Sequence, residues 1–238
     1  MTLANIPAIL ILLRDLVRYN LKIIFANKFI YFLLAAFLFL VLVVGITIAN
    51  DATMSSAMVY GFLILPGMLL MFYPIVYGVQ NDDDSKMLEI IFGIPNYRYK
   101  IWLTRFVIVM GVTFLNVLFL SILANYTLYQ ISILEMVYEL MFPITFMASL
   151  GFMLSSRIRS GNGTAITMVI LGLIFFVFSE PLRTSEWNIF LNPFRDPRNL
   201  NQVIWESVIF KNRLYLSIGS ALCILYTLYN LQFREKFL

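Results

Sequence analysis

The amino-acid sequence predicts an all-α membrane protein with six transmembrane helices, and both composition and hydropathy support this fold class. Of the 238 residues, 61% are hydrophobic and only 13% are charged. Soluble domains contain roughly 45–50% apolar and about 25% charged residues. Apolar runs recur almost from end to end, and most are near the ~20 residues that a helix needs to cross the hydrocarbon layer. We therefore expect one transmembrane domain over residues 1–238, without an additional soluble domain.

The positions of these runs define the six expected spans. The first has no charged residue, and the second contains Pro66 and Pro74. A proline inside a membrane helix frees backbone carbonyls that neighbouring groups must satisfy, so the second span is expected to face protein. The spans are expected at 29–49, 58–80, 102–125, 136–156, 164–178 and 214–233.

The distribution of lysine and arginine predicts the orientation. Basic residues lie in the N-terminal segment, in the connection between spans 2 and 3, in the 4–5 loop and in the C-terminal tail, whereas loops 50–57 and 126–135 have none. Basic loops stay in the cytoplasm, so both termini are expected to be cytoplasmic, in a bacterial inner membrane. The 5–6 connection, with five basic residues, disagrees, but the rule weakens for long loops.

Two segments outside the spans are expected to lie at the membrane surface. In residues 7–26, Arg14, Arg18 and Lys22 recur every four residues and share one helical face, which is typical of an interfacial helix. Packing of this helix on other helices is the alternative. The outer segment 180–212 is rich in aromatic residues and is expected to be interfacial or re-entrant, with a short amphipathic helix at 200–210.

The composition also excludes several kinds of chemistry. The chain has no histidine and one cysteine, Cys223, which rules out His-based catalysis, His-ligated metals and an intramolecular disulfide. It has no G-x-x-x-x-G-K-[ST] run for binding nucleotide phosphates. We expect no catalytic residue, no metal and no cofactor bound by this chain. The positive charge lies beside the spans, so no nucleic-acid partner is expected.

The most informative stretch is the connection between spans 2 and 3, which reads YGVQNDDDSKMLEIIFGIPNYRYKIWLTRF over residues 77–106. Three aspartates at 82–84 can cap and charge-stabilise a helix start. A short apolar run follows and ends at Gly93 and Pro95. A helix of two turns with an exposed apolar side has little reason to form unless it buries that side. Packing back on the bilayer or on the spans is the alternative to docking on a partner.

This connection resembles the cytoplasmic segment of ABC-2 type transporter permeases. There, an acid-x-acid-x-Gly-Thr-Leu-Glu run precedes apolar residues, a small residue, a proline and a basic residue. The order of elements along the rest of the chain is also similar, although Lys86 stands at the usual glycine position. In that family the segment contains a coupling helix that docks on a separate ATPase subunit. By resemblance, the residues that contact the ATPase are Asp82, Asp84, Leu88, Glu89, Ile91 and Pro95 in the segment 82–95.

The resemblance implies a function for the chain. It would be the permease subunit of an ATP-binding-cassette exporter, not itself an enzyme, with ATP and Mg held by the partner ATPase. Its other partners would be membrane lipids and a second permease, either another copy or a related chain. Two alternatives stay open: a substrate-binding membrane component of another ATP-driven transporter, and an intramembrane lipid-modifying enzyme.

Polar residues within or beside the spans are candidates for gating or for a substrate path. Asn116 lies in the middle of span 3, where a hydrogen bond across helices is common. Glu139 is about one turn inside span 4, and Glu180 lies at the outer end of span 5. We expect one of these acids to pair with an outer-loop arginine such as Arg183 or Arg195 and to close the outer side.

Overall fold

The computed structural model describes residues 29–50, 53–78, 80, 93, 96–158, 160–197 and 200–232. The expected interfacial helix at 7–26 lies outside the described residues. So do the expected ATPase contacts Asp82, Asp84, Leu88, Glu89, Ile91 and Pro95.

Six helices that are long and apolar enough to cross a membrane make up most of the described chain. The α-helices themselves are 19 to 29 residues long, and the described residues include no β-strand. The prediction of an all-α, six-span membrane protein is confirmed at this level. The helices are α2 (Phe29–Ala49), α3 (Ser56–Val76), α6 (Thr104–Thr127), α7 (Ile133–Ile158), α8 (Gly161–Ser179) and α9 (Gln202–Asn230), with a π-helical turn, η2 (Arg98–Leu103), directly before α6.

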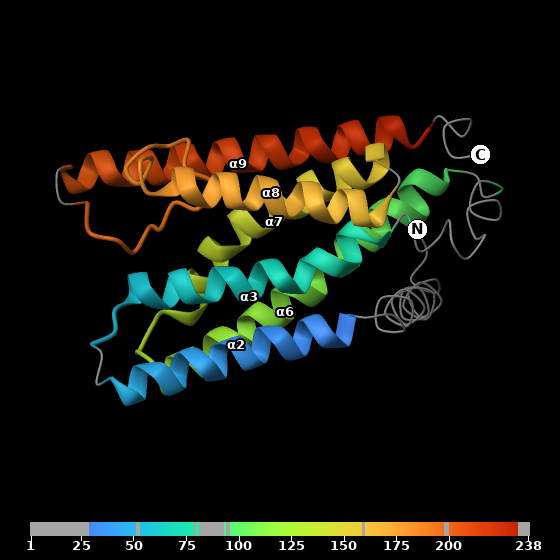
Figure 1. Ribbon diagram of the computed structural model, residues 1–238. Helices are drawn as coiled ribbons and strands as arrows, with labels where there is room; N and C mark the ends of the chain where they lie inside the picture. Colours follow the sequence, from blue (N-terminus) through green and yellow to red (C-terminus); the bar gives the residue numbers. More distant parts are fainter. Residues whose placement is uncertain are drawn as a thin grey trace, which may run out of the picture.

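Successive helices run in opposite directions (Figure 1). The start of α2 and the end of α9 therefore lie at one end of the bundle, which we call the proximal end. We call the opposite end the distal end. It holds the turn between α6 and α7 and also residues 180–197, and we call residues 180–197 the distal segment. The two ends of the bundle are formed by different connections between helices, so each end can contact a different environment or partner.

Helices α3 and α7 form the centre of the bundle. Helix α3 packs against α2, α6 and α7, while α9 and α8 pack mainly on α7. Pro66 and Pro74 are both buried within α3, so the expectation that this span faces protein is confirmed. At Gly67 an added Cβ would overlap the side chain of Ile144 in α7, which shows how closely the two central helices approach.

The outer helices present apolar side chains away from the protein. In α8, Leu173, Phe176 and Val177 are largely exposed, as are Leu38 and Leu42 in α2. Lipid tails are as apolar as these side chains, so this surface suits a hydrocarbon environment. The exposed apolar surface agrees with a multi-pass membrane protein.

The structure corrects the expected outer part of the last span. The prediction of a separate amphipathic helix at 200–210 is wrong, because residues 202–210 are the beginning of α9, which continues unbroken to Asn230. The distal segment before it consists of turns. In two of these turns the side chains of Asn188 and Asn192 accept hydrogen bonds from the backbone N–H two residues later, at 3.0 and 3.1 Å, a conformation that asparagine favours.

Candidate functional site

A buried ion pair lies beneath the distal segment. Nε of Arg213 in α9 lies 2.7 Å from Oε2 of Glu139 in α7, and the two side chains are only 7% and 14% exposed. Nη1 of Arg213 also donates to Oδ1 of Asn212 at 2.9 Å, and Nη2 donates to the carbonyl of Leu191 at 3.3 Å. The guanidinium lies over the ring of Phe142, 5.4 Å from its centroid. Both buried charges therefore have close partners, as burial of a charge requires.

The distal segment is held to the bundle through its backbone carbonyls. The side-chain amide of Asn212 donates to the carbonyls of Glu186 and Asn188, both at 2.8 Å. The hydroxyl of Tyr60 in α3 donates to the carbonyl of Leu191 at 3.2 Å. A segment of turns cannot satisfy its own polar groups as a helix does, so these side chains make its close approach to α3 and α9 possible.

An exposed charge cluster lies on the same segment. Glu180, at the C-terminal end of α8, pairs with Arg195 and with Arg183, each at 3.3 Å. The hydrogen bond and the charge of Arg195 lower the pKa of Glu180 below its ordinary value, and Arg183 adds to this effect. The expected pairing between an outer acid and an outer-loop arginine is thus present at Glu180. Glu139 pairs instead with Arg213, which the sequence alone did not single out.

A cavity of about 540 Å³ opens between α3, α7 and α8. The distal segment covers one end of it through Phe190, Asn192 and Arg195, while apolar side chains form most of the wall. Gly61 and Gly172 widen it, since an added Cβ would meet no atom within 4 Å at Gly61 and only Met147 at Gly172. The helical lining residues are Tyr60, Gly61, Ile64, Leu65, Met68, Met71, Phe72, Met147, Met168, Val169, Gly172, Leu173, Phe176 and Ser179.

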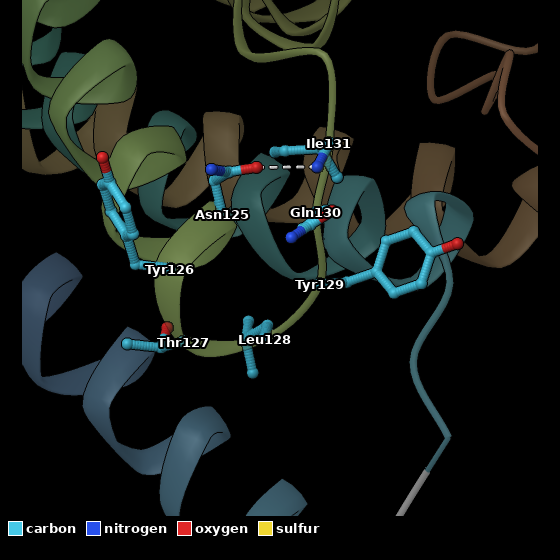
Figure 2. Close-up of a pocket in the computed structure, with 7 residues that line it drawn as sticks. All are labelled: Asn125, Tyr126, Thr127, Leu128, Tyr129, Gln130 and Ile131. Atoms are coloured by element: carbon cyan, nitrogen blue, oxygen red, sulfur yellow. Dashed lines mark hydrogen bonds between the residues drawn. The ribbon is translucent and has the colours of Figure 1, made fainter.

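A second concavity, of about 510 Å³, lies at the distal turn between α6 and α7. Figure 2 shows that it is lined by one continuous stretch, residues 125–131, with the side chain of Asn125 accepting a hydrogen bond from the backbone N–H of Ile131 at 2.8 Å. Because no other element contributes to it, we interpret it as the hollow of a turn. The first cavity, which joins four elements, is the better candidate for a binding site.

The proximal end ties together the two described flanks of the 2–3 connection. On the α3 side, Tyr77 donates to Oδ1 of Asn162 at 3.1 Å, and the side chain of Gln80 accepts a hydrogen bond from the backbone N–H of Gly161. Both of these partners lie at the start of α8. Residues next to the end of α3 therefore contact the first turn of α8 directly.

The other flank of this connection is attached to the end of α9. The hydroxyl of Tyr97 donates to the carbonyl of Leu231, and Nη1 of Arg98 donates to the carbonyl of Leu228 at 3.2 Å and to the side chain of Gln232 at 2.9 Å. The chain enters this flank at Asn96, whose φ of 58° is left-handed, and asparagine tolerates that conformation better than most residues.

The structure separates the candidate polar residues into different environments. Asn116 donates to the carbonyl of Val112 in its own helix at 2.8 Å, so the expected hydrogen bond across helices is not the one present. Glu139 and Glu180 lie toward the distal end, and Arg195 lines the cavity. Glu180 and Arg195 come together in the ion pair, while Glu139 and Asn116 belong to other sites.

The sequence contained a signal for the residues that were missed. Asn212 and Arg213 follow an amphipathic stretch and precede an apolar run, and a polar pair inside what proves to be one long helix indicates burial against polar partners. Among the described residues, no group of three or more His, Cys, Asp or Glu side chains is arranged to hold a metal ion.

Comparison of the chain with protein-family models, with curated proteins and with solved structures finds no match.

Proposed function

We propose that the chain is the permease subunit of an ATP-driven exporter of the ABC-2 type. In this proposal the proximal end and both termini lie on the cytoplasmic side of a bacterial inner membrane. A separate ATPase subunit binds at the proximal end. The ATPase holds ATP and Mg, and it contacts the segment 82–95 through Asp82, Asp84, Leu88, Glu89, Ile91 and Pro95. A second permease, either another copy or a related chain, completes the transporter.

The observation that carries the proposal is the attachment of both flanks of the 2–3 connection to other helix ends. Tyr77 and Gln80 contact the start of α8, while Tyr97 and Arg98 contact the end of α9. A displacement of this connection would therefore reach α3, α6, α8 and α9 through direct contacts. Rigid elements linked in this way can carry a conformational change across a membrane domain.

The proposal is tested by co-purification of the membrane-inserted chain with a candidate ATPase subunit from the same cell. We expect the ATPase to accompany the wild-type chain and to be lost from Leu88→Arg and from Glu89→Lys, because each change places the wrong charge in the proposed contact. The matched control is Leu134→Arg, at an exposed position in the first turn of α7 at the distal end, which should retain the ATPase.

Three outcomes would contradict the proposal. If no ATPase accompanies the wild-type chain, the exporter function fails, and the two alternatives of a substrate-binding component and a lipid-modifying enzyme return. If the ATPase accompanies both proximal variants unchanged, the contact does not lie in 82–95. Loss from Leu134→Arg as well would show that the variants are misfolded rather than locally impaired, and the contact would then have no support.

A further inference from the structure

We propose that the cavity between α3, α7 and α8 is a binding site for an anionic lipid-like molecule, with its tail in the cavity and its headgroup at Arg195. The proposal goes beyond the exporter function, because it concerns a ligand of this chain alone. It rests on the length of the cavity, on the chemistry of its wall and on the charge at its distal end.

The length of the cavity matches one leaflet of a bilayer. Along α3 the lining residues extend from Tyr60 to Phe72, and along α8 from Met168 to Ser179. At a rise of about 1.5 Å per residue, these stretches are roughly 16–18 Å long. The hydrocarbon core of a bilayer is about 30 Å thick, so the cavity reaches from the distal end to about the middle of the bundle. An acyl chain of one leaflet covers the same depth.

The wall of the cavity suits a flexible apolar tail. Met68, Met71, Met147 and Met168 all line it, and methionine side chains adapt to irregular apolar ligands because they are unbranched and polarisable. The volume of about 540 Å³ falls within the range of small-molecule sites, roughly 300–1,000 Å³. A lipid tail would fill a space that α3 and α8 leave open between them.

The distal end of the cavity has the opposite character. Arg195 lines it, next to Asn192, and Arg183 shares the carboxylate of Glu180 with Arg195. Arg195 is the single charged side chain among the residues that line the cavity, and its partner Glu180 does not line it. An arginine binds phosphate or carboxylate oxygens in a two-pronged geometry, so the headgroup that complements this end is anionic.

The test is native mass spectrometry of the full chain, released from mixed micelles that contain phosphatidylglycerol and phosphatidylcholine with identical acyl chains. We expect the wild-type chain to retain phosphatidylglycerol several-fold more than phosphatidylcholine. Gly61→Phe should abolish retention of both lipids, because its ring enters the open space beside Gly61. Arg195→Gln should still bind lipid but lose the preference for the anionic headgroup.

The control is Gly111→Phe, which adds the same ring at another exposed glycine, in α6, with no atom within 4 Å of its Cβ. It should behave as wild type. Equal retention of the two lipids by the wild-type chain would overturn the proposal. A preference for phosphatidylglycerol that survives both Gly61→Phe and Arg195→Gln would also overturn it, because the lipid would then be bound elsewhere on the surface. If Gly61→Phe instead separates a dimer without changing lipid retention, the cavity is occupied by a second copy of the chain and the lipid site is refuted.

Discussion

Arg213 is the residue on which the attachment of the distal segment depends most directly. Its guanidinium joins Glu139 of α7, the carbonyl of Leu191 and Asn212 at one buried point. Removing one member of a buried ion pair leaves the other charge without compensation and typically costs about 3–5 kcal/mol. Replacing both members by apolar residues of similar size is often neutral, so the single and double variants give different results.

We expect Glu139→Gln to lower the free energy of unfolding by roughly 3 kcal/mol and the double variant Glu139→Leu with Arg213→Met to recover most of that loss. Thermal unfolding in detergent, monitored by tryptophan fluorescence, measures the loss of stability in the single variant and its recovery in the double variant. The control is Lys211→Met, which breaks the more exposed pair of Lys211 with Glu186 at 3.7 Å and should change stability by about 1 kcal/mol or less. A double variant as unstable as the single one would contradict this account of the pair.

At the scale of elements, the boundaries of the spans show what could be predicted from the sequence. The apolar runs placed all six helices, because hydropathy reports directly on the ability to cross a bilayer. Asn212 and Arg213 interrupt the last run, so the sequence suggested two helices where there is one. The helix continues because partners that are distant in the sequence, Glu139 and the carbonyls of Glu186 and Asn188, satisfy these polar side chains. Local patterns do not contain that information.

The candidate site could be predicted only in part for the same reason. One of the acids Glu139 and Glu180 was expected to pair with an outer-loop arginine such as Arg183 or Arg195, and it is Glu180 that pairs with both arginines. The cavity was not predicted from the sequence, because its wall combines residues of α3 and α8. Gly61 and Gly172, for example, both line it but are over a hundred positions apart in the sequence. Only the packing of α8 on α7 places them opposite one another.

The distal segment should respond to acid through Glu180. Because Arg195 and Arg183 lower the pKa of this carboxyl from its ordinary value of 4.5, its ionised form is favoured in the folded chain. The stabilisation is complete above pH 4.5 and is lost as the pH falls through the lowered pKa. We expect amide hydrogen exchange in residues 183–197, corrected for intrinsic rates, to accelerate in that acidic range. In the Glu180→Gln variant, the amides of residues 183–197 should exchange faster already at neutral pH and should lose this dependence on acid. Identical exchange profiles for the variant and the wild-type chain would contradict the role given to Glu180.

At the scale of the whole molecule, the described residues form an even number of candidate spans, which makes the two ends of the bundle topologically distinct. The proximal end holds both ends of the six-helix array, and the distal end holds the distal segment (Figure 1). The distal segment covers one end of the cavity. The positive-inside distribution of lysine and arginine predicts that the proximal end faces the cytoplasm. This orientation determines from which side the ATPase and the lipid would reach the chain.

Labelling of single cysteines in whole cells tests the orientation. In a Cys223→Ser background, Gln130→Cys in the distal turn should react with a membrane-impermeant maleimide from outside the inner membrane. Tyr99→Cys in η2, also at an exposed position, should react only after the membrane is made permeable. The reverse pattern would place the proximal end outside, and the proposed cytoplasmic ATPase contact would then be impossible.

Helix α9 has a mechanical consequence that follows from its length. Its 29 residues correspond to about 43 Å at a rise of 1.5 Å per residue, which is more than the hydrocarbon thickness of about 30 Å. Near its start, Nε1 of Trp205 donates to the carbonyl of Pro193 in the distal segment at 3.4 Å, and near its other end the carbonyl of Leu228 accepts a hydrogen bond from Arg98. If such a rod turned by about 10° around its middle, each end would move by roughly 4 Å in opposite directions. A rotation of this kind would couple a displacement at the proximal end of α9 to one of similar size at the distal segment.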